Sequence, residues 1–336
     1  MKEKYKWIRR VTRASLLSGL MLPALLLAAG APDWRPDKRI EVVVPSGAGG
    51  GNDRLVRIIQ KTVQERKLAE AVITIVNKPG AGQVVGIAYL NQQPPDGHHI
   101  GIASVSFMTN YIMGRSPIGP NELTPLALLF AEYVGFAVKP DSKIKTGKDL
   151  LAALKADAGS ISASMSGGGA GNHNHLALAI VTTAVGGDIK KLKAVAYPSG
   201  KDAMMALLGG HVDLAVAPAA TLLPQIQSGQ LRMIAITAPR RMEGAFAQVP
   251  TWRELGANAV VSNWRAMIAP KGLAPPAIAY WEQVLARVVE TEDWKKMLEE
   301  DVVTSQFLRS VEARSYLNAQ HDELKAVLSG LGMAKP

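Results

Sequence analysis

The chain has 336 residues, 48% of them hydrophobic and 20% charged, and its formal net charge is +10. This composition excludes a disordered chain and can bury the cores of two domains or of one large domain. The chain has no cysteine, which excludes disulfides, thiolate zinc sites and a lipid-bearing cysteine. Nucleic-acid binding is disfavoured because the basic residues are dispersed and aromatic residues make up only 5% of the chain.

The first 30 residues differ from the rest of the chain. A basic segment that ends at Arg13 precedes an apolar segment, Ser15 to Ala31, which finishes in small residues. That order is typical of a secretory signal peptide. The alternative is a membrane anchor, but the apolar segment is shorter than the roughly 20 residues that span a bilayer, and Pro23 interrupts it. We therefore predict a signal peptide over residues 1–30, cleaved near residues 29–31, and an exported mature chain.

The rest of the chain alternates apolar runs with helical patterns. The runs are continuously apolar, which favours strands whose sheet is covered on both faces. Between them, apolar residues recur at helical spacing from Leu55 to Val63 and from Met204 to Leu208. We predict a mostly parallel, doubly wound α/β sheet. Its predicted strands are residues 40–45, 71–76, 99–104, 192–197, 212–217 and 231–237.

The C-terminal part departs from this alternation. One helical stripe begins at Pro275, and a second helix is predicted from about Val311 to Leu328. Two turn-rich segments, residues 137–147 and 237–250, are the predicted boundaries between lobes. We predict lobe 1 over residues 31–140 plus 245–336, and an inserted lobe 2 over residues 141–244. Two crossings between the lobes would form a hinge.

A glycine-rich loop, Gly47 to Gly51, lies between the first predicted strand and the first helix. Its spacing does not fit the dinucleotide fingerprint, and no Gly-Lys-Ser/Thr triplet follows, so nucleotide binding is not expected. A strand, a glycine loop and a helix start together favour an anion site made of backbone N–H groups. Asn52 and Asp53 are both good helix N-cap residues. Asp53 is kept as a candidate contact. Because a carboxylate would repel an anion, the alternative is that Asp53 fixes the loop.

A second loop repeats this pattern from Ser162 to Ile180, with a strand, glycines, Asn172 and an apolar helix. Two such loops in different lobes are able to hold one anion from opposite sides. His173 and His175 raise the alternative of a metal site, but no carboxylate or cysteine nearby completes a ligand set. We expect no metal, and we interpret both histidines as polar or hydrogen-bonding residues of the first helical turn.

Several segments in order carry a family resemblance. The chain resembles the extracytoplasmic solute receptors of tripartite tricarboxylate transporters, called Bug receptors, over nearly all of its mature length. "NWRAMIAP", from Asn263, is similar to the tricarboxylate-receptor branch. The segments that carry the resemblance are "VPSGAGGGND", Val76 to Ser104, Gly167 to Ala177, Ala196 to Ala217, Ser228 to Thr237, Val249 to Gly256 and Asn263 to Leu273.

The resemblance implies the type II fold of periplasmic binding proteins, with two α/β lobes and a ligand cleft between them. It also implies a periplasmic location, a small carboxylate ligand, integral-membrane transporter subunits as partners and no cofactor; we expect a monomer. Arg265 is the residue that would pair with a second carboxylate of the ligand. The ligand contacts carried over from the family are Gly49, Gly50, Gly51, Asn52, Ser104, Ser106, Gly169, Gly171, Asn172, Tyr197, Trp264 and Arg265.

Two positions depart from the family pattern. Asn52 stands where the family usually has Thr or Ser, and Asn172 stands where it usually has Ser. Each amide is longer than a hydroxyl and carries both a donor and an acceptor, which implies a smaller pocket or a different ligand.

The predicted mechanism is binding without chemistry, in which the lobes close over the carboxylate by hinge rotation. An enzyme that uses the same cleft is the alternative from another class. It is disfavoured because no nucleophile, base and orienting residue can be assembled from known motifs. A sensory receptor that feeds a signalling partner is the third interpretation, and the sequence does not separate it from transport.

Overall fold

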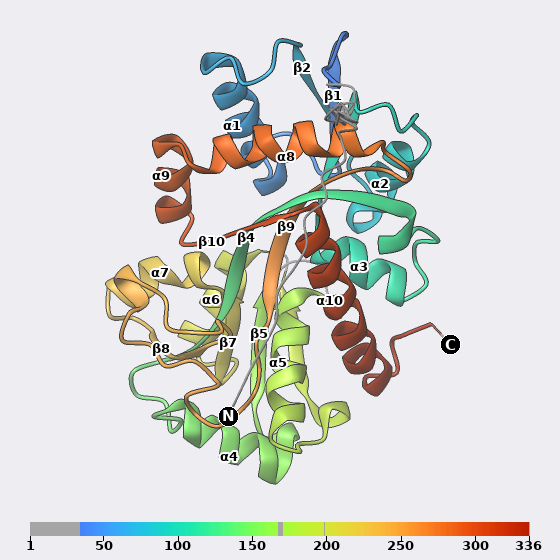
Figure 1. The fold of residues 1–336 in the computed structure, drawn as a ribbon. Coiled ribbons are helices and arrows are strands. Elements are labelled where there is room, and N and C mark those ends of the chain that lie inside the picture. Colours follow the sequence, from blue (N-terminus) through green and yellow to red (C-terminus); the bar gives the residue numbers. More distant parts are fainter. Residues whose placement is uncertain (1–33, 167–170, 198, 336) are drawn as a thin grey trace, which may run out of the picture. The chain divides into compact units, whose positions relative to one another are not determined.

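The computed structural model describes residues 34–166, 171–197 and 199–335. Within these residues, strands form one mixed sheet in the order β2-β1-β3-β9-β4-β7-β5-β6, and β8 and β10 also pair with β4 (Figure 1). The strands are β1 Ile40–Val44, β2 Ile73–Asn77, β3 His99–Ser104, β4 Leu123–Val138, β5 Ser162–Ser166, β6 Lys193–Tyr197, β7 Leu214–Pro218, β8 Arg232–Ile236, β9 Ser262–Pro270 and β10 Thr304–Arg309.

The helices lie on both faces of this sheet. None of the helices in the described residues is long and apolar enough to cross a membrane. The helices are α1 Gly51–Glu65, α2 Val84–Asn91, α3 Val105–Ile112, α4 Gly147–Asp157, α5 His173–Ala184, α6 Gly200–Leu208, α7 Ala219–Gln227, α8 Pro275–Val289, α9 Glu292–Glu300 and α10 Ser310–Gly330.

β4 is the strand that the two parts of the sheet share. Its first part pairs with β9 and β10, and its last part pairs with β7 and β8. The change of partner falls between Tyr133, opposite Ser262 of β9, and Val134, opposite Pro218 of β7. We call β1, β2, β3, β9 and β10 with the first part of β4 the first half of the sheet. The second half consists of β5, β6, β7 and β8 with the last part of β4.

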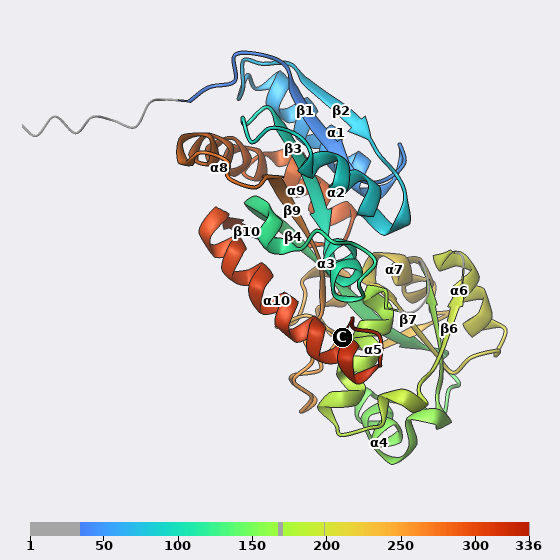
Figure 2. The ribbon, with the colours of Figure 1, turned by 90° about the vertical axis from the view of Figure 1, so that its right-hand side faces the viewer.

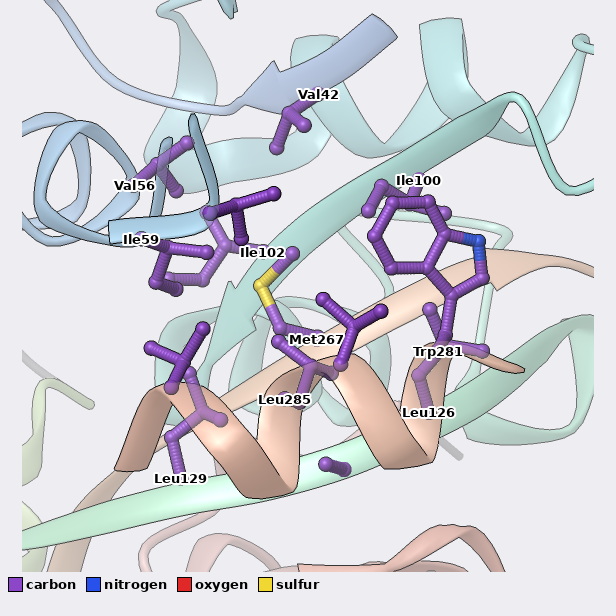
Figure 3. Close-up of a cluster of buried hydrophobic side chains, with 14 of the residues drawn as sticks. Val42, Val56, Ile59, Ile100, Ile102, Leu126, Leu129, Met267, Trp281 and Leu285 are labelled. Carbon is purple, nitrogen blue, oxygen red and sulfur yellow. The ribbon is translucent and has the colours of Figure 1, made fainter. Parts of the chain in front are cut away.

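Each half buries an apolar layer on both faces. In the first half, α1, α8 and α9 cover one face, where Trp281 and Leu285 pack with Ile102 and Met267 (Figure 3). α2, α3 and α10 cover the other face. In the second half, α4 and α5 cover one face, and α6 and α7 the other. Since fully burying one large apolar side chain contributes about 1.5–3 kcal/mol, these layers account for the cohesion of the sheet.

The six apolar runs predicted as strands are found as β1, β2, β3, β6, β7 and β8. Covering of both faces is confirmed for β1, β3, β7 and β8, whereas the edge strand β2 is only partly buried and the edge strand β6 is largely exposed. The prediction of a mostly parallel sheet is wrong. β4 is antiparallel to β7, β8, β9 and β10, and β3 is antiparallel to β9. An apolar run indicates burial but carries no information on strand direction, which only the partner strands determine.

The predicted C-terminal helices are found as α8 and α10. α10 packs against β4, α3 and α5, and so contacts helices of both halves (Figure 2). Its buried Leu328 belongs to the core of the first half, while Val327 packs against the core of the second half. The predicted lobe boundaries remain a prediction.

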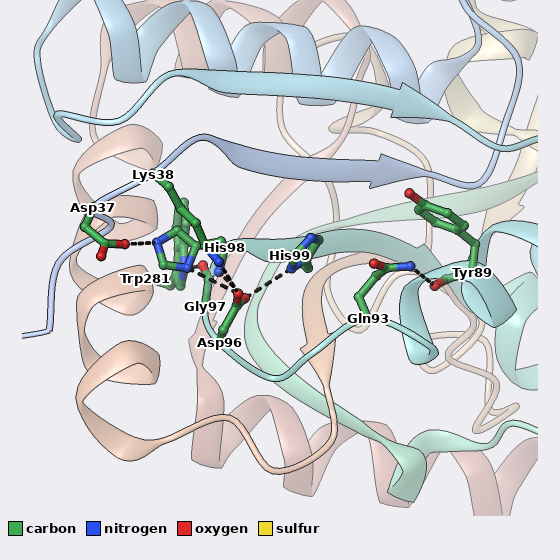
Figure 4. A network of polar contacts seen from close by, with 9 residues as sticks. All are labelled: Asp37, Lys38, Tyr89, Gln93, Asp96, Gly97, His98, His99 and Trp281. Atoms are coloured by element: carbon green, nitrogen blue, oxygen red, sulfur yellow. Dashed lines mark hydrogen bonds and ion pairs between the residues drawn. The ribbon is translucent and has the colours of Figure 1, made fainter.

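A polar network attaches the segment from Trp34 to Lys38 to the first half (Figure 4). Asp96 accepts hydrogen bonds from the His98 amide and pairs with Lys38 Nζ at 3.0 Å. Burial raises the pKa of Asp96, but hydrogen bonds from His98, Lys38 and His99 outweigh it and lower the pKa to about 2. The network lies at the N-terminal end of β3, away from the strand ends described below.

Candidate functional site

The strand register brings two sets of strand ends together at the middle of β4. β1 and β3 run in the direction of β4, because β3 is antiparallel to β9 and β9 is antiparallel to β4. β5, β6 and β7 run in the opposite direction. The carboxyl ends of the two sets therefore face each other across β4. In α/β proteins, ligands bind at the carboxyl ends of strands, where the loops begin.

Pairing residues locate this meeting point. Ser104, the last residue of β3, lies opposite Arg265 of β9, and Arg265 lies opposite Phe130 of β4. Pro218, the last residue of β7, lies opposite Val134. The two sets of ends thus meet between Phe130 and Val134.

The first glycine loop follows β1 and leads into α1. Gly49 has a left-handed backbone, with φ of +80°, and its N–H donates to Asp53 Oδ2 at 2.8 Å. Asp53 also accepts from Arg57 Nε at 2.8 Å and from Asn77 Nδ2 at 2.9 Å. The hydrogen bond from Arg57, with those from Gly49 and Asn77, outweighs burial and lowers the pKa of Asp53 to about 2. Asp53 is an ionised, 1% exposed residue that holds the loop.

The expected N-cap at Asn52 or Asp53 is wrong, because α1 begins at Gly51 and its N-cap is Gly50. Gly50 has no side chain to accept a hydrogen bond from the first amides of the helix. Those amides lie at the positive end of the helix dipole. Asn52 is buried in this first turn, and Gly51 has open space around the position of a Cβ. An anion can therefore reach the backbone here.

A third loop, residues 81–83, was not among the predicted ligand contacts, but it supports Ser104. Ala81, Gly82 and Gln83 all have left-handed φ angles of 44°, 61° and 84°. The amide of Gln83 bonds Ser104 twice, accepting from its backbone N at 3.3 Å and donating to its hydroxyl. Asn110 Nδ2 donates to Gly82 O at 2.7 Å. Non-glycine residues in this conformation are strained and cluster at functional sites.

A sequence signal for this loop was present, since the family-like segment from Val76 to Ser104 contains it. Its contact with the end of β3 depends on a chain reversal that the sequence does not reveal. Ser104 is the buried N-cap residue of α3, and Ser106 lies partly exposed in the first turn of that helix.

Arg265 and Trp264 are neighbours in β9 that point to opposite faces, as alternation along a strand requires. Trp264 is fully buried in the core beneath α3 and α10. Arg265 Nη1 donates to the carbonyl oxygens of Asn263 at 3.1 Å and of Trp264 at 3.2 Å. Its Nη2 lies 3.9 Å from Glu132 Oε2. Burial lowers the pKa of Arg265, and the Glu132 carboxylate opposes that shift.

The start of α5 carries the described part of the second glycine loop. Gly171 is buried with φ of +85°, and its N–H donates to His175 Nδ1 at 3.0 Å. Asn172 caps the helix, because its Oδ1 accepts from the His175 amide at 2.9 Å. Burial lowers the pKa of His175, which keeps the ring neutral and its Nδ1 able to accept. Gly169 lies outside the described residues.

His173 lies in the first turn of α5, within electrostatic range of Glu132 on β4 and Arg265 on β9. Burial lowers the pKa of His173, while the charge of Glu132 raises it and that of Arg265 lowers it. Its Nε2 is buried without a hydrogen-bond partner among the described residues. Tyr197 ends β6 and is partly buried against the core beneath α6 and α7.

A surface hollow and the possibility of a metal site were also considered among the described residues, and neither adds to this site. A surface hollow of about 350 Å³ lies at the opposite end of α1 from the glycine loop, between Gln64 and Val72. No group of three or more His, Asp or Glu side chains in the described ranges has the arrangement of a metal site.

Comparisons with known proteins agree on one family. The sequence model described as "Tripartite tricarboxylate transporter family receptor" matches residues 55–333. Protein BugT of Bordetella pertussis is 28% identical over 274 residues, which cover 80% of this chain and 82% of BugT.

Solved structures share the fold. A TctC solute-binding protein from Polaromonas superposes with a TM-score of 0.78 at 26% identity, covering 88% of this chain and 99% of that protein. Rpa4515 of R. palustris, solved with adipate, superposes with a TM-score of 0.69 at 20% identity, covering 89% and 99%. The expected α/β fold of periplasmic binding proteins is confirmed.

Proposed function

Because the chain belongs to the tripartite tricarboxylate transporter family of receptors, we propose that it is a periplasmic receptor for a small carboxylate. The family is described as the receptors of tripartite tricarboxylate transporters, and Rpa4515 of R. palustris, which shares the fold, was solved with adipate. The ligand would be delivered to integral-membrane subunits of the transporter. The predicted signal peptide, residues 1–30, lies outside the described residues and would direct the chain to the periplasm.

The observation that carries this proposal is the meeting of the strand ends at the middle of β4, between Phe130 and Val134. Loops from both halves of the sheet begin there, so one ligand is able to contact both halves. The proposal assigns capture to the first turn of α1, whose Gly50 N-cap leaves the leading amides without a side-chain acceptor. Gly49, through its bond to Asp53, sets the loop that presents them.

Gly171, Asn172 and Tyr197 would contact the ligand from the second half after closure. Ser104 and Ser106 would line the same site from the end of β3 and the start of α3. Asp53 would act on the ligand only through the loop, since its oxygens already accept three hydrogen bonds. Trp264 would support β9 from the core.

The test measures binding after removal of any co-purified ligand. The mature protein is unfolded, refolded and heated with mono-, di- and tricarboxylates, amino acids and neutral solutes. A ligand at about 100 times its dissociation constant adds about 2.7 kcal/mol of stability. Stabilisation by a neutral solute and by no carboxylate would refute the proposal, and turnover of a ligand would indicate an enzyme.

A companion variant tests the first glycine loop. Gly50→Leu places a side chain where even a Cβ would lie 3.1 Å from Gly47 O, and we expect carboxylate affinity to fall at least about tenfold. Gly330→Leu, at the end of α10, is the control. Unchanged affinity in folded Gly50→Leu would remove this loop from the site.

A further inference from the structure

Glu132 is the charged residue of β4, a strand of otherwise almost entirely apolar sequence. It lies between Phe130 and Val134, where the two sets of strand ends meet. Its side chain is 19% exposed, whereas Ala131 and Val134 are fully buried. The core around it therefore leaves an opening to solvent at this carboxylate, inside the site proposed above.

The contacts of Glu132 use one oxygen. Oε2 accepts from Asn263 Nδ2 at 2.8 Å and lies 3.9 Å from Arg265 Nη2. No residue in the described parts of the chain donates to Oε1, which retains its full capacity to accept. Among the described residues, the Glu132 carboxylate is therefore held through Oε2 alone.

Arg265 does not offer a free cation beside it. Its Nη1 is used by two backbone carbonyls, and its Nη2 faces Glu132. The Glu132 carboxylate at 3.9 Å offsets the charge that a ligand carboxylate would otherwise meet at this guanidinium. The positive charge of Arg265 is thus balanced within the protein.

The imidazole of His173, which belongs to the second half, is a third ionisable group near Glu132 and Arg265. His173 of α5 lies within the electrostatic influence of both Glu132 and Arg265, and its ring is held neutral by burial. Near this point the protein thus supplies one carboxylate, one guanidinium and a neutral imidazole. Their charges cancel, and a second carboxylate of a ligand finds no uncompensated cation among them.

From this arrangement we infer the ligand class: a carboxylate that also carries a hydroxyl or ammonium donor, rather than a plain di- or tricarboxylate. The carboxylate would bind the amides at the start of α1, and the donor would bind Glu132 Oε1. This inference rests on the proposed function and adds the chemistry of the second end of the ligand. It assigns Glu132 as the residue that determines specificity, because a carboxylate accepts donors and repels anions.

The experiment uses matched straight-chain carboxylates of about three to six carbons whose far end is methyl, hydroxyl, ammonium or carboxylate. Dissociation constants are measured by calorimetry on the refolded mature protein. We expect the best hydroxyl or ammonium compound to bind at least about tenfold more tightly than the dicarboxylate of equal length. In Glu132→Gln, the ammonium compound should lose at least about tenfold and the dicarboxylate should gain.

Glu65→Gln, on the exposed end of α1, is the matched control and should leave every ratio unchanged. A wild-type protein that prefers the dicarboxylate would overturn the inference while leaving the proposed function intact. Equal ratios in wild type and folded Glu132→Gln would also overturn it. Binding of no carboxylate at all would overturn both. If Glu132→Gln does not fold, the wild-type ratio decides.

Discussion

The two glycine loops reach similar backbone shapes by different means. Each contains a glycine with a left-handed φ, the exposed Gly49 at +80° and the buried Gly171 at +85°, whose N–H donates to a side chain four residues later. In the first loop that side chain is the ionised Asp53, and in the second it is the neutral His175. One loop is therefore held by a charge and the other by neutral hydrogen bonds.

The helix starts differ as well. α5 is capped by Asn172, whereas α1 begins after a glycine that has no side chain to cap it. Because the leading amides of α1 are left to solvent or ligand, the first loop is the better place for an anion to bind first. The following four predictions test this difference, from the largest expected effect to the smallest.

Removing the charged anchor should have the largest effect. Asp53→Ala removes the acceptor of the Gly49 N–H, the charge partner of Arg57 and one of the two acceptors of Asn77 Nδ2. We expect a loss of about 3 kcal/mol in the free energy of unfolding. Urea denaturation at neutral pH measures it. Asp141→Ala, at a residue whose side chain is 78% exposed, should change stability by about 0.5 kcal/mol or less. A loss below about 1 kcal/mol for Asp53→Ala would mean that other contacts hold the first loop.

Alanine at the two left-handed glycines should separate backbone strain from packing. Gly171→Ala should cost about 2 kcal/mol, since its Cβ would lie 2.9 Å from Met113 Sδ in addition to the strained φ. Gly49→Ala should cost about 1 kcal/mol, because nothing lies within 4 Å of its Cβ. Equal costs by urea denaturation would show that packing around Gly171 adjusts freely.

Loss of the cap should affect only the second helix start. Asn172→Ala should destabilise the protein by about 1 kcal/mol, while Asn172→Asp keeps the acceptor oxygen and should remain close to wild type. Thermal unfolding of the two variants provides the measurement. If both variants lose the same stability, the amide group of Asn172 matters more than its capping oxygen.

The pH dependence should distinguish the loops with little change at neutral pH. The lowered pKa of His175 means that its contribution is complete above about 6.5 and declines as the pH falls below that value. The pKa of Asp53, lowered from 3.8 to about 2, keeps its contribution complete above about 4 and lets it decline toward pH 2.

The measurement is the hydrogen-exchange rate of the Gly49 and Gly171 amides as a function of pH, corrected for intrinsic rates. It shows which of the two loops loosens first as the pH falls. Gly171 should begin to lose protection as the pH falls below about 6.5, and Gly49 only below about pH 4. His175→Asn should remove the first change and leave the second. Loss of protection at both amides in the same pH range would contradict the contrast between the loops.

Much of the fold was predictable because burial leaves a local signal. The apolar runs that became β1, β3 and β7 are bounded by turn residues, and the stripe from Leu55 to Val63 marks α1. β4 and β9 were not predicted as strands, and with them the antiparallel pairs were missed. A long apolar run such as β4 reads equally as a strand or a buried helix until its partners are known.

The sequence predicted the backbone loops of the candidate site, but it did not predict which side chains pair with one another there. The glycine loops were evident from spacing, but Gln83 and Glu132 were not proposed as site residues. Gln83 acquires its role by contact with Ser104, and Glu132 by its position between Arg265 and Asn263. Such contacts join residues about 20 to 130 positions apart, and one sequence does not encode those pairings in any local pattern.

The sequence by itself determined the apolar runs, the glycine loops, the absence of cysteine and the family, because each depends on residue type and order along the chain. Only the tertiary structure decided that the strand ends meet at the middle of β4 and that Asp53 is an internal anchor. It also decided that Arg265 is already paired with Glu132. The reason is physical: strand direction, burial and charge compensation depend on partners brought together by folding, and those partners lie far away in the chain.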